Sequence, residues 1–74
     1  MTDTPLVLFT SENCGLCVKA KEALAFLGLG YQEVLVADDH PYRLRTPVIE
    51  QAGRVVAEGM IDRVILRRAL HRRA

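Results

Sequence analysis

The pattern of apolar and polar positions predicts a strand, a helix and a second strand in the first half of the chain. Residues 6–9 are a continuous apolar run, which is typical of a strand buried on both faces of a sheet. The pattern over residues 15–27 is helical, and Gly28 suits a helix C-terminus. Residues 31–36 predict a second strand, parallel to the first because a helix connects them. The apolar face of the helix has four members: Cys17, Ala20, Leu24 and Leu27.

The second half of the chain predicts a loop followed by a β-hairpin. Residues 38–45 are polar and indicate a loop with room for one helical turn. Two short strands are expected over residues 46–51 and 54–57. Ala52-Gly53 between them suits a tight turn, because glycine readily adopts positive φ.

The last predicted element is a helix over residues 62–72, with Asp62 as its N-cap. The order of elements is therefore βαβ followed by ββα. This order indicates an α/β fold whose four-stranded mixed sheet has the strand order 2-1-3-4, with the helices packed on it. A chain of 74 residues is too short for two cores, so we expect residues 1–74 to form a single domain. The apolar face of the last helix is expected to hold Ile61, Val64, Ile65, Ala69 and Leu70.

Composition and charge exclude several classes of function. Half of the residues are hydrophobic and 26% are charged, which is typical of a globular chain rather than a disordered one. The formal net charge of +1 argues against nucleic acid as a partner. The apolar run over residues 6–9 is far too short for a signal peptide or a membrane span. We therefore expect a cytoplasmic monomer with no membrane partner.

The last part of the chain is nevertheless basic. No acidic residue follows Asp62. Cations near the end of a helix complement its dipole, each by about 0.3–1 kcal/mol. This role is the simpler one for these side chains, and docking of an acidic partner is the alternative. The basic residues are five arginines: Arg63, Arg67, Arg68, Arg72 and Arg73.

Reactive chemistry is concentrated in the motif Cys14-Gly15-Leu16-Cys17. Residues 10–13 before it are of types that cap helices, so Cys14 is placed at a helix N-terminus. Such a position stabilises a thiolate and can lower a thiol pKa from about 8.5 to about 3.5–7.5. We therefore expect Cys14 to attack a disulfide. Cys17 lies almost one turn further on the apolar face, and we expect it to be the buried cysteine that resolves the mixed disulfide.

The arrangement of motifs resembles that of glutaredoxins and of small glutaredoxin-like proteins with a minimal thioredoxin fold. The resemblance covers essentially the whole chain, because a buried strand, a CxxC at a helix start, Thr46-Pro47 before a hairpin and a final helix all match. It implies a thiol-disulfide oxidoreductase with a redox-active disulfide, which transfers electrons to protein or small-molecule disulfides without a bound cofactor. It further implies a cis Pro47 facing the cysteines, and a substrate segment that contacts Gly15 and Leu16 and pairs with the backbone of Thr46.

The sequence departs from glutaredoxins where those proteins bind glutathione. A lysine common in the family is replaced by Ser11, and the Gly-Gly and Asp of the glutathione site are matched only by Gly59 and Asp62. Gly59 and Asp62 remain candidate substrate-binding residues, although capping is the simpler role for Asp62. Arg43 and Arg45 are suited either to glutathione carboxylates or to keeping the loop soluble. The electron donor is therefore either glutathione, as a co-substrate, or a flavoprotein disulfide reductase.

Metal binding is the alternative to redox chemistry. A closed zinc site needs four ligands, and only His40 and His71 are available beyond the two cysteines, without suitable spacing. Copper-chaperone domains also place a CxxC after their first strand. Their element order is βαββαβ, and they carry a methionine where this chain has Glu12. We therefore expect no metal site, and we keep a metal-binding carrier as the alternative function.

Overall fold

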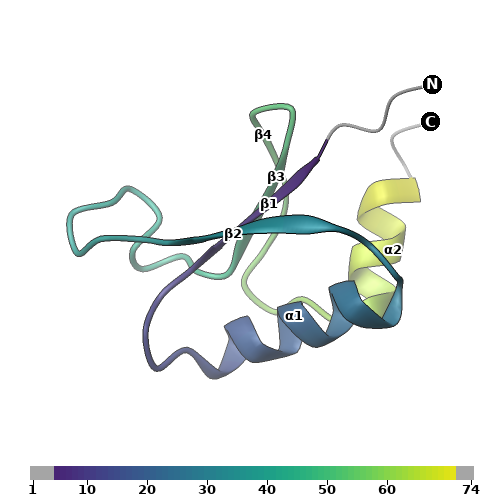
Figure 1. The fold of residues 1–74 in the computed structure, drawn as a ribbon, viewed down its shortest axis with the longest axis horizontal. Helices are drawn as coiled ribbons and strands as arrows, with labels where there is room; N and C mark the ends of the chain where they lie inside the picture. Colours follow the sequence, from purple (N-terminus) through teal and green to yellow (C-terminus); the bar gives the residue numbers. More distant parts are fainter. Residues whose placement is uncertain (1–4, 72–74) are drawn as a thin grey trace.

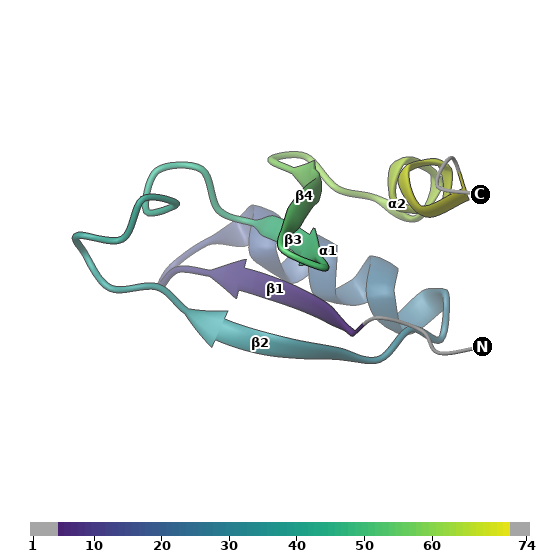
Figure 2. The same cartoon turned by 90° about the horizontal axis from the view of Figure 1, so that it is seen from above.

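The computed structural model describes residues 5–71, in which six elements follow in the predicted order (Figure 1). Strand β2 is parallel to β1, and β3 is antiparallel to both β1 and β4. The sheet order β2-β1-β3-β4 confirms the predicted topology. Figure 2 shows β1 and β2 side by side, with α1 behind them. The elements are β1 (Leu6–Thr10), α1 (Gly15–Phe26), β2 (Tyr31–Leu35), β3 (Val48–Gln51), β4 (Arg54–Glu58) and α2 (Arg63–His71).

The hydrophobic core lies between one face of the sheet and the two helices. Alternate residues of β1 point into it, and both Leu6 and Leu8 are at most 5% exposed. The apolar face predicted for α1 is confirmed at Cys17, Ala20 and Leu24, which are all buried. Core residues come from β1, α1, β3 and the region of α2, so both helices cover the same face. They are Leu6, Leu8, Ala20, Ala23, Leu24, Ile49, Ile61 and Leu66.

The opposite face of β1 is covered by the segment between β2 and β3. The expectation that residues 6–9 are buried on both faces is therefore wrong for Val7 and Phe9, which are only half-buried. The ring centroid of Phe9 lies 5.6 Å from that of His40 and 5.1 Å from that of Tyr42. A few aromatic side chains from a loop shield less surface than a packed helix does. This segment is built of consecutive turns and contains no helix.

The buried face of α2 differs from the predicted one. Val64 and Ile65, expected in the core, are 48% and 41% exposed, whereas Leu66 is fully buried. The physical reason is the phase of the helix. Ile61 is buried but precedes the first helical residue, so spacing counted from it does not follow the rotation of about 100° per helical residue. The predicted cap is confirmed, because Asp62 Oδ1 accepts a hydrogen bond from the backbone N–H of Ile65 at 2.8 Å.

The predicted hairpin turn is also confirmed. Ala52 and Gly53 both have positive φ, at 55° and 75°, which matches the twist of the flanking strands.

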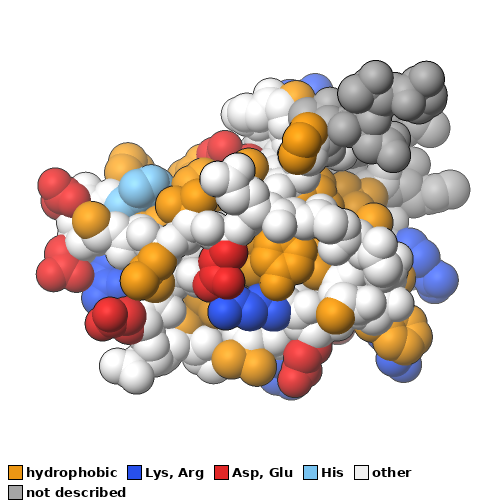
Figure 3. Space-filling view, viewed as in Figure 1, with side chains coloured by type: hydrophobic (Ala, Val, Ile, Leu, Met, Phe, Trp, Pro, Cys, Tyr) orange, Lys and Arg blue, Asp and Glu red, His pale blue; other side chains and the backbone are white. Residues whose placement is uncertain are grey.

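In the view of Figure 3, acidic and basic side chains are interspersed, and this face has no extended patch of one charge. Among the described residues, neither helix is long and apolar enough to cross a membrane.

Candidate redox site

Cys14 and Cys17 lie at the junction between β1 and α1, where they form a disulfide with their Cα atoms 5.3 Å apart. Cys14 is the N-cap of α1 and has an extended backbone, with φ −108° and ψ 103°. Its Sγ accepts a hydrogen bond from the backbone N–H of Cys17, with an N···S distance of 3.1 Å. Sulfur thus takes the place of the oxygen with which Ser, Thr, Asp or Asn usually caps a helix. The cap is Cys14 itself, not one of residues 10–13.

The two sulfurs have different surroundings. Cys17 is only 3% exposed and faces the core, whereas Cys14 is half-buried. On the outer side of the motif, Leu16 is 39% exposed. A Cβ built on Gly15 would meet no atom within 4 Å, so the space beside the motif is open. The geometry gives an approaching molecule access from the side of Cys14.

Thr46 and Pro47 are brought to the same end of the sheet as the cysteines. The Thr46-Pro47 peptide is cis, as the resemblance implied. The hydroxyl of Thr46 is hydrogen-bonded to that of Ser11 at 2.7 Å, which links it to the segment that leads into Cys14. The carbonyl of the buried Pro47 accepts a hydrogen bond from the N–H of Gly59 at 2.9 Å. The contact made by Ser11 was not predicted, because a hydroxyl pair 35 residues apart leaves no local signal.

A polar network holds the turn segment that leads into Thr46. Arg45 Nε donates to Glu58 Oε1 at 2.8 Å, and the Arg45 guanidinium lies 5.0 Å from the ring centroid of Tyr42. The Tyr42 hydroxyl donates to Glu50, and this hydrogen bond raises the pKa of Tyr42. The hydrogen bond with Arg45 lowers the pKa of Glu58 and raises that of Arg45. Together these contacts tie the turn segment to β3 and β4.

The charged groups considered for glutathione already have partners in the structure. Arg43 pairs with Asp38 at 3.4 Å, and Arg45 pairs with Glu58. The carboxylate of Asp62 caps α2. Gly59 has a positive φ of 74° and contacts Pro47 through its backbone N–H. At each of the three side chains, a glutathione carboxylate or amine would therefore share a charged group that already has a partner within the protein.

A second group of polar contacts, centred on Glu33, joins β1, β2 and α1. The hydroxyl of Thr10, only 2% exposed, donates to Glu33 Oε2 at 2.9 Å. Lys21, one helical turn after Cys17, contacts the same oxygen at 3.0 Å. The hydrogen bond from Lys21, and then that from Thr10, lowers the pKa of Glu33. The carboxylate therefore fastens β1 and β2 to the first turns of α1.

A metal site would need several ligating side chains close together in space. Within residues 5–71, no three His, Cys, Asp or Glu residues lie close enough together to hold a metal ion. His40 instead packs against Phe9 and accepts the backbone N–H of Tyr42 at its Nδ1, at 2.9 Å. The side chain of His71 lies outside the described part of the structure. The observed role of His40 is therefore to shape the turn segment.

The chain is similar to known proteins in both sequence and structure. Residues 6–56 match the model of the glutaredoxin family, a range that includes both cysteines and Thr46-Pro47 but neither Gly59 nor Asp62. The X-ray structure of Northeast Structural Genomics target protein XcR50 from X. campestris is similar, with 34% sequence identity and a TM-score of 0.79. That similarity covers 90% of this chain and 96% of the other chain. A comparison with curated proteins gave no match.

Proposed function

Because this chain belongs to the glutaredoxin family, we propose that it is a dithiol oxidoreductase that reduces protein disulfides through Cys14 and Cys17. Family membership and the Cys14–Cys17 disulfide support thiol redox chemistry in general. The observation that carries the finer proposal is the unequal environment of the two sulfurs. Cys14 Sγ accepts an N–H at the helix N-terminus, where a thiolate is stabilised, while Cys17 is 3% exposed.

The reaction proceeds in two exchange steps. In the reduced protein, the Cys14 thiolate attacks one sulfur of the substrate disulfide, and the other substrate sulfur leaves as a thiolate that takes up a proton. Cys17 then loses its proton and attacks Cys14 Sγ, which breaks the mixed disulfide and releases the second substrate thiol. Two electrons pass from the protein to the substrate, and the Cys14–Cys17 disulfide is formed. An external reductant restores the dithiol.

A polypeptide substrate has better support than glutathione. The open space beside Gly15 and the exposed side chain of Leu16 leave room for a large molecule next to Cys14. Thr46 lies at the same end of the sheet, where its backbone would pair with an extended substrate segment. Arg43, Arg45 and Asp62 are already engaged. We therefore propose a flavoprotein disulfide reductase as the electron donor, in the reducing environment of the cytosol.

The metal-carrier alternative has less support from the fold. In the copper-chaperone order βαββαβ, a helix separates the third strand from the fourth. In this chain β3 and β4 are joined directly as a hairpin, and α2 follows them. The CxxC is therefore set in the element order of a glutaredoxin.

Trapping of a mixed disulfide tests the proposed function. The Cys17→Ser variant should accumulate one equivalent of a covalent adduct with a disulfide-bonded peptide, because the resolving thiol is absent. Intact-protein mass spectrometry measures the adduct. The matched Cys14→Ser variant should form almost none, because its remaining thiol is buried. An adduct formed at comparable rates by both variants would contradict the division of roles.

A further inference from the structure

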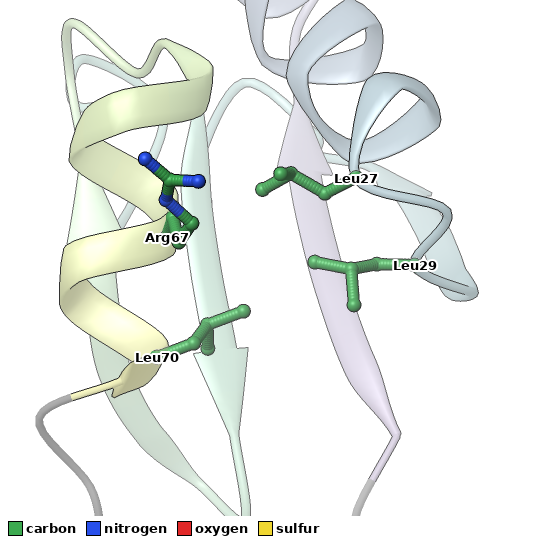
Figure 4. Close-up of a pocket in the computed structure, with 4 residues that line it drawn as sticks. All are labelled: Leu27, Leu29, Arg67 and Leu70. Atoms are coloured by element: carbon green, nitrogen blue, oxygen red, sulfur yellow. The ribbon is translucent and has the colours of Figure 1, made fainter.

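A groove lies at the far end of α1, away from the cysteines. It has a volume of about 360 Å³ and is lined by Leu27, Leu29, Arg67 and Leu70. Figure 4 shows the leucine side chains reaching into the space between α2 and the segment that follows α1, with the guanidinium of Arg67 beside them. The 12 residues of α1 separate this groove from Cys14 by about 18 Å, at a rise of about 1.5 Å per residue. The groove is therefore separate from the redox site.

The rim of this groove is positively charged. Within residues 5–71, Arg67 has no ion-pair partner, and α2 itself contains no acidic residue. Arg63, one turn earlier on α2, lies with its guanidinium 4.2 Å from the ring centroid of Phe26, which adds a second cation near the end of α1. An anion placed at Arg67 would therefore meet no nearby compensating carboxylate on the same helix.

We propose that this groove binds the carboxylate of a medium-chain fatty acid. An apolar floor with the cation Arg67 at its rim complements a molecule with an apolar tail and a single anionic head. The acyl chain would lie against Leu27, Leu29 and Leu70, and the carboxylate would contact Arg67. The groove is open to solvent on one side, so the acyl chain would be covered by the protein along one face only.

Backbone amide NMR of the full-length protein tests this site directly. Titration with decanoate, below the concentration at which it forms micelles, should shift the amide signals of Leu27, Leu29 and Leu70. Affinity should rise from hexanoate to octanoate to decanoate, because each added methylene buries more apolar area. Arg67→Gln should weaken decanoate binding by about twofold to fivefold, the range expected for loss of an exposed ion pair.

The neighbouring Arg68 provides a matched control. Arg68→Gln makes the same change in net charge, but Arg68 lines a different depression, between α2 and β4. This variant should bind decanoate as the unmodified protein does. Both arginine variants should also keep their rate of disulfide reduction, so failure of the groove proposal and failure of the redox proposal are distinguishable.

Several outcomes would overturn the proposal. Absence of shifts at the groove would remove the site. Equal affinity for decanoate, decanol and decyltrimethylammonium would show apolar contact without recognition of a carboxylate. Equal weakening by the two arginine variants would show a general effect of charge. Tighter binding of an acidic leucine-containing peptide than of decanoate would assign the groove to a protein partner instead.

Discussion

The sulfur of Cys14 is both the N-cap of α1 and one half of the disulfide. In the disulfide form the N–H of Cys17 is directed at this sulfur, 3.1 Å away, and the same contact would be available to a thiolate after reduction. Thr46 is held near this point by its hydrogen bond to Ser11. The Ser11–Thr46 hydrogen bond therefore positions Thr46, the proposed substrate-binding residue, relative to Cys14.

The Ser11–Thr46 hydrogen bond should contribute measurably to stability. Ser11→Ala and Thr46→Val each remove one partner, so each should lower the free energy of unfolding by about 1 kcal/mol in urea titrations. The double variant should lose less than the sum of the two, with a coupling of about 0.5–1.5 kcal/mol. Strict additivity in this cycle would show that the two hydroxyls do not stabilise each other in solution.

Glu33 of β2 connects three elements, because its carboxylate contacts Thr10 of β1 and Lys21 of α1. These three elements carry the junction that holds the dithiol, while α2 packs on the same face from the other end. The turn segment covers part of the opposite face through Phe9 and Tyr42. The position of the CxxC thus depends on strand and helix contacts that are distant in sequence.

The stabilisation from Glu33 should depend on pH in a defined direction. Its pKa in the folded protein is below the ordinary value of 4.5, so folding favours the ionised carboxylate. The contribution is fully present above pH 4.5 and is lost as the pH falls through the lower folded-state pKa. Urea unfolding across this range should find Glu33→Gln less stable than the unmodified protein at neutral pH, with the difference shrinking on acidification. A difference that grows on acidification would contradict the assignment.

Sequence patterns predicted the elements well because local signals encode them. The apolar repeat of α1, the cap at Asp62 and the turn at Ala52-Gly53 each lie within a few residues of the structure they specify. The burial of Leu66 was not predicted. The apolar spacing was counted from Ile61, which is buried but lies before the first residue of α2, so the predicted buried face was rotated from the observed one. Contacts such as Ser11–Thr46 and Phe9–Tyr42 depend on how strands and turns are placed in three dimensions, so spacing alone does not reveal them.

Taken as a whole, the molecule has two chemically different ends. Figure 1 draws the turn segment at one end of the long axis and α2 towards the other, and α1 starts between them and runs towards α2. The cysteines lie at the start of α1, close to Thr46 at the end of the turn segment, whereas the basic helix and the groove lie on the α2 side. A partner engaged at the cysteines would therefore leave the groove accessible.

Glutathione should be a poor electron donor for the whole protein. Its charged groups would share Arg43, Arg45 and Asp62 with their present partners, and weakening of one charge-assisted contact by about 1.5 kcal/mol corresponds to about a tenfold weaker interaction. Steady-state oxidation of NADPH should be faster with a flavoprotein disulfide reductase than with glutathione and its reductase at equal protein concentration. Faster, saturable turnover with glutathione would show that these side chains rearrange to form a glutathione site.

The rate of alkylation of each cysteine as a function of pH tests the central assignment most directly. In the Cys17→Ser variant, Cys14 should react with iodoacetamide with a midpoint below the free-thiol value of about 8.5, because the helix N-terminus stabilises its thiolate. In the Cys14→Ser variant, Cys17 should react much more slowly at neutral pH, because it is 3% exposed. Equal rates for the two thiols, or a faster Cys17, would contradict the assignment of Cys14 as nucleophile and Cys17 as resolving cysteine.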